Sequence, residues 1–397
     1  MKTILALTLS CALIAGNPLA AFAQQPVQPA EAEADSAAPS ALQEIVEQAE
    51  ALDPLEALLI ARDGELIVEE GFRGHSTTAT TNIKSASKSV VSALVGIAID
   101  KGILEGVDQK IAPILRDKLP EDADPRIETI TIGHLLSMQA GLRPTSGPNY
   151  GRWIAGRDWV AGVLAEPFED DPGGGMLYST GSTHLLSAIL TQEAGKPTLE
   201  LAREWLGPVQ GFRIGHWLRD RQGIYMGGNQ MAMSPRSMLA FGELYRNRGK
   251  VGDVQVISEE WIDQSWTPRT RSIYHGDEYG YSWFISEMGG TPVYYAWGFG
   301  GQMIYVAPEV GLTVVMTSDE SRPSASNGYR DKLHRLMESI VVAVSSDGAA
   351  QSGNEEASPA EDSGHDEDAE EAGESDAQDG ASTPADDAVE QDEELAE

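Results

Sequence analysis

The chain has 397 residues, 41% of them hydrophobic, and its 62 acidic and 28 basic residues give a formal net charge of −34. This composition can fill a sizeable core, but the acidic balance argues against nucleic acid or an anionic membrane as a partner. Cys11 is the single cysteine and lies in a segment expected to be removed, which excludes disulfides, thiolate catalysis and cysteine-ligated metals.

Residues 1–23 have the features of a secretory signal peptide. The cation Lys2 precedes an apolar run from Ile4 to Ala15, and Ala21-Phe22-Ala23 supplies small residues for cleavage. We therefore expect a secreted or periplasmic protein. Residues 24–41 are rich in Gln, Pro, Ala and Ser and are expected to form a disordered linker. No later stretch reaches the roughly 20 apolar residues of a membrane-spanning helix.

A folded domain is predicted over residues 42–346, beginning with a short helix at Leu42–Leu52. Two apolar runs around Arg62-Asp63-Gly64 then predict an antiparallel hairpin with Asp-Gly at its turn. Helical periodicity and glycine- and proline-rich loops follow. The predicted helical segments are 88–101, 131–139, 181–194, 197–206 and 234–248.

The C-terminal part of the domain predicts a second hairpin and a long closing helix. The hairpin strands are Met303–Ala307 and Leu312–Thr317, and the helix lies in NGYRDKLHRLMESIVVAVSS. We therefore predict an α+β fold in which strands from both chain ends form an antiparallel sheet flanked by helices, with a mostly helical subdomain at about 88–250. Residues 347–397 contain 20 acidic residues and no lysine or arginine, which predicts a disordered acidic tail.

The stretch KSASKSVVSALVG, residues 84–96, places a serine and a lysine at the start of a predicted helix. Lys88 follows Ser85 by three residues and shares its helix face. Free N–H groups at the helix start would point at Ser85, and desolvation would lower the pKa of Lys88 enough to make it a base. Alternatively, Ser85 is a plain N-cap and Lys88 a surface cation.

Several segments in the same order resemble the serine β-lactamase and penicillin-binding-protein superfamily. They are KSASKSVVSALVGIAIDKG, ITIGHLLSMQAGL, PGGGMLYSTGSTHLLSAIL, MSPRSMLAFGELYRNRG, YGYSWF and WGFGGQMIYVAPE. The chain is most similar to the branch of class C β-lactamase-related esterases and 6-aminohexanoate-dimer hydrolases, over roughly Leu55 to Val342. The resemblance implies a β-lactamase/D,D-peptidase-like fold, Ser85 as nucleophile and Lys88 as its activator.

The resemblance also implies a catalytic tyrosine and an oxyanion hole. Tyr178 matches the family tyrosine. Thr180 replaces the asparagine that many β-lactamases have two residues later, and it is expected at the substrate-binding site. Phe299 stands near the position of the lysine that pairs with the carboxylate of β-lactams. Gly300 follows Phe299 and would let the backbone approach the substrate closely. An N–H near Phe299 is therefore expected to form the oxyanion hole together with the N–H of Ser85.

Two aromatic residues are further candidates for the substrate site. Tyr150 and Trp297 flank the site segments and are expected at a substrate groove, with core packing as the alternative. His134 and His184 lie in helical patterns and are expected to be structural. No histidine spacing indicates a metal, and no cofactor is expected.

The sequence therefore predicts an exported serine hydrolase that cleaves a small ester or amide substrate through an acyl-enzyme. The open alternatives are a β-lactamase or D,D-peptidase, weakened by Thr180 and Phe299, and a catalytically silent binding or sensor protein. The sequence carries no signal for a particular oligomeric state.

Overall fold

The computed structural model describes residues 40–272 and 275–355. The predicted signal peptide, most of the linker (24–39) and residues 356–397 of the predicted tail lie outside the described residues. Among the described helices, none is long and apolar enough to cross a membrane.

An eight-stranded sheet is built from both ends of the domain, as predicted. Its order is β2-β1-β12-β11-β10-β9-β8-β7, and β1 pairs antiparallel with β12, so that Leu58 faces Met316. The strands are β1 (Leu55–Arg62), β2 (Glu65–Gly71), β7 (Thr270–Arg271), β8 (Glu278–Tyr279), β9 (Phe284–Met288), β10 (Thr291–Gly298), β11 (Gln302–Ala307) and β12 (Leu312–Ser318). Two short pairs, β3 (Thr81–Asn82) with β4 (Ala232–Met233) and β5 (Lys250–Val251) with β6 (Val254–Gln255), lie outside this sheet.

Both predicted hairpins are confirmed. Asp63 and Gly64 have φ angles of 50° and 86°, the left-handed pair that suits a two-residue turn between antiparallel strands. In the second hairpin a 3-10 turn at Pro308–Val310 and a left-handed Gly311 connect β11 to β12.

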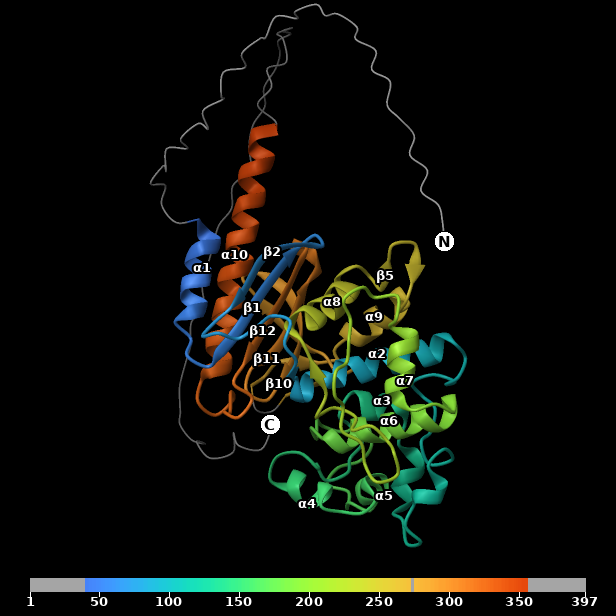
Figure 1. Cartoon of the computed structure of the whole chain (residues 1–397). Coiled ribbons are helices and arrows are strands. Elements are labelled where there is room, and N and C mark those ends of the chain that lie inside the picture. The colour runs from blue at the N-terminus through green and yellow to red at the C-terminus, as the bar shows by residue number, and fades with distance from the viewer. Residues whose placement is uncertain (1–39, 273–274, 356–397) are drawn as a thin grey trace, which may run out of the picture. The chain divides into compact units, whose positions relative to one another are not determined.

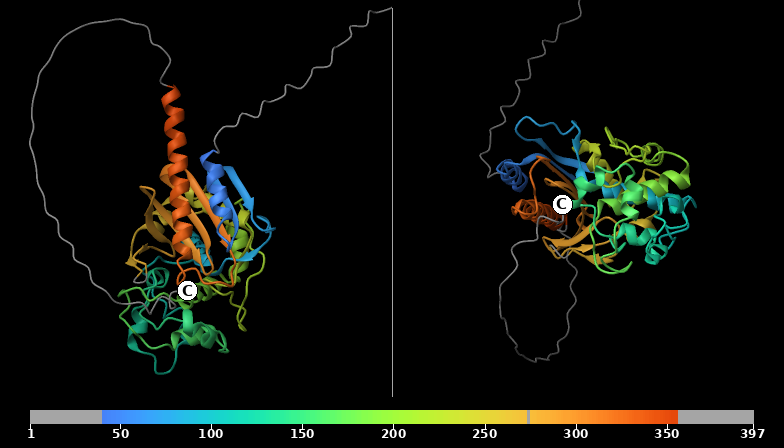
Figure 2. Two further views of the ribbon diagram at one scale, coloured as in Figure 1. Left: turned by 90° about the vertical axis from the view of Figure 1, so that its left-hand side faces the viewer. Right: turned by 90° about the horizontal axis from the view of Figure 1, so that it is seen from below.

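Helices cover both faces of the sheet (Figure 1). On one face α1 (Ala41–Glu50) packs beside α10 (Tyr329–Glu355), and Figure 2 shows α10 in front of the strands. This helix continues past position 346, where the sequence analysis ends the domain. The opposite face packs against α8 (Pro235–Arg246) and α2 (Ser87–Asp100).

The inserted region between β2 and β7 is mostly helical, and its core around α2 and α6 is continuous with the face of the sheet that carries Leu59, Ile304 and Val315. Its remaining helices are α3 (Ile132–Leu136), α4 (Tyr150–Ile154), α5 (Trp159–Leu164), α6 (Thr180–Ala194), α7 (Thr198–Trp205) and α9 (Glu259–Trp266). The five helical segments predicted from periodicity correspond to α2, α3, α6, α7 and α8. Because α2 is buried on nearly every side, residues at its start lie between the sheet and the helical region.

Candidate active site

Ser85 lies on a 3-10 turn, Lys84–Ala86, that leads directly into α2. The residue before it, Lys84, has a left-handed φ of 49°, which is costly for a side chain with a Cβ and is found at functional sites. Two hydrogen bonds hold this conformation: the Lys84 N–H donates to Asn82 Oδ1 at 3.0 Å, and Ser87 Oγ donates to the Lys84 carbonyl at 2.7 Å. Ser85 is not the N-cap of α2, because Ala86 occupies that position.

Lys88 is buried, with 1% of its surface exposed. Its Nζ lies 2.8 Å from Ser85 Oγ, 2.9 Å from the Gly228 carbonyl oxygen and 3.3 Å from Thr180 Oγ1. Burial lowers the pKa of Lys88 to about 7. A neutral amine has two N–H donors and one lone pair, so it can donate to Gly228 and Thr180 while its lone pair accepts the Ser85 proton. The surface-cation alternative for Lys88 is therefore wrong.

The loop containing Gly227 and Gly228 can approach Lys88 because neither residue has a side chain. A Cβ on Gly227 would overlap the Thr183 carbonyl oxygen, and a Cβ on Gly228 would lie 2.7 Å from Lys88 Cγ. Gly228 also has a φ of +87°, which glycine adopts readily. The sequence analysis did not single out these glycines, although two adjacent glycines in YMGGNQ are the type of signal that marks close backbone approach.

Tyr178 lies two residues before α6, whose N-cap is Ser179, and reaches the same site. Lys88 Nζ lies 4.8 Å from the centre of its ring, within cation–π range for the protonated amine. The ring stacks on Phe284 at 6.2 Å between centroids and meets Tyr279 edge-on at the same distance. The structure thus brings together Ser85, Lys88 and Tyr178 from a 3-10 turn, a helix and a loop.

Thr180, in the first turn of α6, is 3% exposed and directs its hydroxyl to Lys88. The partners of this side chain within the protein are the lysine and Ser146. Ser146 Oγ accepts from the Thr180 N–H at 2.8 Å and lies 3.0 Å from Thr180 Oγ1. Sequence analysis missed Ser146, which sits in the loop PTSGPN with nothing in its spacing to connect it with Thr180.

Phe299 and Gly300 form the turn between β10 and β11, and this turn lies beside the nucleophile. The strand β10 packs against the 3-10 turn that carries Ser85, and a Cβ on Gly298 would overlap the Ile83 carbonyl oxygen. Phe299 is half-buried. Gly300 has a φ of +86° and faces the chain at 319–322, since a Cβ there would lie 2.7 Å from the Asp319 carbonyl oxygen. Close packing against this backbone therefore explains why a glycine occupies position 300.

Tyr150 lies over the loop that supplies Gly228. Its hydroxyl donates to Met226 Sδ at 3.4 Å and also interacts with the Gln230 side chain. Burial raises the pKa of Tyr150, so the phenol is protonated at neutral pH. Its polar contacts are therefore with the loop at 226–230.

Trp297 has the environment of a core residue. It is 6% exposed, its Nε1 donates to Ser324 Oγ at 3.2 Å, and its ring lies 5.9 Å from Phe284 and 5.5 Å from the Arg330 guanidinium. These contacts are those of the core-packing alternative, because the alternation of β10 directs this indole into the cluster that α10 shares with the sheet.

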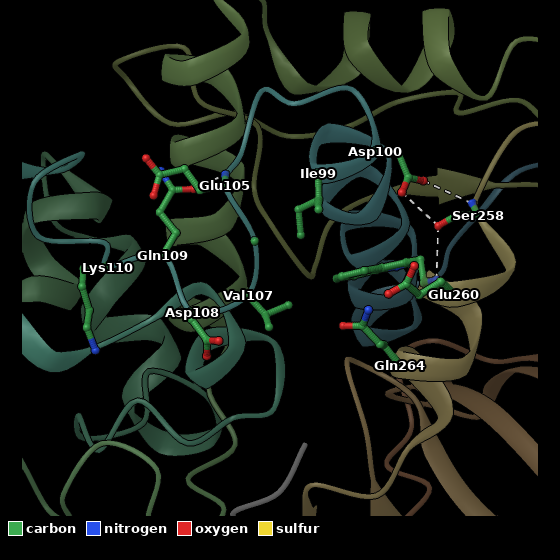
Figure 3. A pocket seen from close by; sticks show the side chains of 12 residues that line it. Ile99, Asp100, Glu105, Val107, Asp108, Gln109, Lys110, Ser258, Glu260 and Gln264 are labelled. Carbon is green, nitrogen blue, oxygen red and sulfur yellow. Dashed lines mark hydrogen bonds between the residues drawn. The ribbon is translucent and has the colours of Figure 1, made fainter.

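A separate cleft opens at the far end of α2 (Figure 3). Its walls are acidic, and Asp100 there accepts hydrogen bonds from the N–H and hydroxyl of Ser258 at the start of α9. The lining includes none of Ser85, Lys88 and Tyr178. Within the described residues, no group of three or more His, Cys, Asp and Glu side chains could hold a metal ion.

Comparison with known proteins agrees with this fold. The Beta-lactamase family model matches residues 52–337, and no curated protein matches the chain. One similar solved structure is named "Putative 6-aminohexanoate-dimer hydrolase from Bacillus anthracis", with a TM-score of 0.63 and 19% identity over 79% of this chain and 84% of that one.

Two further solved structures show the same fold. EstCE1, a hydrolase with promiscuous acyltransferase activity, has a TM-score of 0.63 and 20% identity over 76% of this chain and 97% of its own. A family VIII carboxylesterase has a TM-score of 0.61 and 17% identity over 76% and 97% of the two chains.

Proposed function

Because the chain belongs to the Beta-lactamase family, whose model matches residues 52–337, we propose that it is a serine hydrolase that cleaves ester or amide bonds by acyl transfer. The observation that carries the proposal is the buried Lys88 amine 2.8 Å from Ser85 Oγ, with a pKa lowered to about 7. Such an amine is partly neutral at physiological pH, and it can therefore accept the proton of the serine hydroxyl.

The proposed reaction has two steps that balance without a cofactor. Ser85 Oγ attacks the carbonyl carbon while its proton passes to Lys88 Nζ, and the Lys88–Tyr178 pair returns a proton to the leaving alcohol or amine. Water then attacks the acyl-enzyme, and its proton passes by the same groups back to Ser85 Oγ. The N–H groups of Ser85 and Phe299 would stabilise the oxyanion, an arrangement typically worth about 3–4 kcal/mol.

Neutral or weakly charged substrates fit the proposed site better than anionic β-lactams. Phe299 stands where the family's anion-binding lysine is expected, and Thr180 is engaged by Lys88 and Ser146. The nearby cation Lys84 is paired with Glu320, with Nζ and Oε2 3.5 Å apart. The net charge of −34 would also repel anionic substrates.

Mass spectrometry after treatment with a fluorophosphonate probe tests the nucleophile. We expect one adduct per chain on the wild-type protein and none on Ser85→Ala. An unlabelled wild-type protein would instead support a catalytically silent binding or sensor protein.

Comparing p-nitrophenyl butyrate with nitrocefin tests the substrate class. We expect kcat/KM for the ester to exceed that for the cephalosporin. The reverse order would favour a β-lactamase or D,D-peptidase.

We also propose that the enzyme acts outside the cytoplasm, in the periplasm or the medium. The support is the charged start, apolar run and Ala21-Phe22-Ala23 site of residues 1–23. N-terminal sequencing of the protein from the producing cells should begin at Gln24, and an intact Met1 would contradict export by cleavage.

A further inference from the structure

A buried histidine and aspartate pair lies in the core of the helical region. His184 sits on α6, one helical turn after Thr180. Both side chains have 0% exposure, and His184 Nε2 faces Asp220 Oδ2 at 3.5 Å. Neither atom has a hydrogen-bond partner among the described residues. A buried ionisable pair is expensive to desolvate, so its presence at this place requires a reason.

The other ring nitrogen of His184 contacts the loop that binds the catalytic lysine. The Gly227 N–H donates to His184 Nδ1 at 3.4 Å. The carbonyl of the following residue, Gly228, accepts from Lys88 Nζ at 2.9 Å. The contacts with His184 and with Lys88 are therefore made by two adjacent residues.

Asp220 fixes the beginning of the same loop. Its Oδ1 accepts from the N–H groups of Gln222 at 2.9 Å and Ile224 at 2.8 Å, which folds the turn that leads into Gly227. Its Oδ2 is left to face His184. The carboxylate thus connects this turn to α6.

The ring of His184 has little freedom to move. Trp153 and Trp159 pack against it, each with its ring centroid 5.6 Å from the imidazole and at a steep angle. With Nδ1 accepting from Gly227, the ring proton of the neutral imidazole belongs on Nε2, the nitrogen that lies 3.5 Å from Asp220 Oδ2. The geometry therefore selects one tautomer and one orientation.

We propose that His184 and Asp220 are positioning residues for Lys88. They hold the Gly227–Gly228 loop against α6, so that the Gly228 carbonyl orients the amine and leaves its lone pair directed at Ser85. This inference rests on the proposed function, which makes Lys88 the base. Thr180 and His184 lie one turn apart on α6. Thr180 contacts the lysine directly, whereas His184 acts on it through the Gly227–Gly228 loop.

The test compares His184→Phe with His334→Phe. His334 is a matched control because its Nε2 is also buried without a partner among the described residues, and its ring packs between Tyr295 and Tyr305 at 5.1 and 5.9 Å. It lies on α10, on the opposite face of the sheet. Both variants lose a buried imidazole and keep an aromatic ring.

We expect His184→Phe to lower kcat for p-nitrophenyl butyrate about tenfold with little change in KM. This is the effect of losing one oriented hydrogen bond, the one between Lys88 and the Gly228 carbonyl. The acidic midpoint of its pH–rate profile should move to lower pH, because the Lys88 ammonium loses a carbonyl acceptor. His184→Gln, whose amide can accept from Gly227 and donate to Asp220, should recover most of kcat. His334→Phe should keep the wild-type kcat and midpoint.

The inference is overturned if His184→Phe keeps the wild-type midpoint and kcat, or if His184→Gln is as impaired as His184→Phe. Titration of Lys88 by NMR of lysine 13Cε-labelled protein reports the same midpoint without substrate. A wild-type protein that hydrolyses neither ester nor amide and takes no fluorophosphonate label would refute the proposed function, while the NMR midpoints of the two variants would still decide whether His184 positions Lys88.

Discussion

The Nζ atom of Lys88 lies 2.8 Å from the Oγ atom of Ser85, and burial lowers the pKa of this lysine to about 7. Only the neutral amine can accept the serine proton. We therefore expect kcat/KM for p-nitrophenyl butyrate to fall tenfold per pH unit below about pH 7 and to level off above it. A profile that stays flat from about pH 5 to 9 would show that another group, or none, titrates in the rate-determining step.

The same burial makes stability depend on pH. The folded pKa of Lys88 is below its ordinary value of 10.5, so between about pH 7 and 10.5 the unfolded chain binds one more proton, and stability rises with pH. Lys88→Met removes this contribution. Its free energy of unfolding relative to wild type should fall by about 1.4 kcal/mol per pH unit between about pH 7 and 9, measured by urea denaturation.

The control for this measurement is Lys101→Met, which replaces an exposed lysine after the end of α2. It should differ from wild type by the same amount at every pH in this range. A constant difference for Lys88→Met as well would mean that the amine is hydrated in solution and keeps an ordinary pKa.

Tyr178→Phe tests the third group of the site. The ring contacts with Phe284 and Tyr279 do not need the hydroxyl, so the variant should fold with a melting temperature close to that of wild type. Loss of the proton relay should lower kcat by about 10²–10³-fold with a smaller change in KM. Steady-state kinetics with p-nitrophenyl butyrate measure both.

Tyr279→Phe is the matched variant, because Tyr279 is a neighbouring buried phenol that packs against Tyr178. It should keep kcat within a few-fold of wild type. Equal losses in the two variants would indicate that the aromatic cluster, not the Tyr178 hydroxyl, supports catalysis.

Sequence reasoning predicted the sheet and the helices because their signals are local. The Asp63-Gly64 turn and the apolar spacing of α2 are readable within a few residues. Ser85 and Lys88 were predictable for the same reason, since helix geometry alone brings residues three apart together. Tyr178 required the family resemblance, because no local rule connects it to a helix some ninety residues earlier in the chain.

The surroundings of Lys88 could not be predicted from spacing. Ser146 and Gly228 are brought to the site by tertiary packing. Ser146 contacts Thr180, and the carbonyl of Gly228 contacts Lys88 directly. Trp297 flanks a site segment in sequence, yet strand alternation turns its side chain toward α10. Proximity in sequence to a site segment therefore does not predict a site residue, because the side of the strand or loop on which the side chain lies decides whether it faces the site.

Gly228→Ala tests whether close backbone approach sets the position of the amine. A Cβ at this position would lie 2.7 Å from Lys88 Cγ and 3.1 Å from Thr183 Cβ, so the loop or the lysine must move.

Gly102 supplies the control, because it also has a positive φ, +68°, but nothing lies within 4 Å of its Cβ position. Both alanine variants bear the backbone cost of a left-handed residue, about 1–2 kcal/mol, and only Gly228→Ala pushes on Lys88. We expect both to lower the free energy of unfolding and only Gly228→Ala to lower kcat, by about tenfold or more. If the two variants had equal kcat, the Gly228 carbonyl would not orient the base.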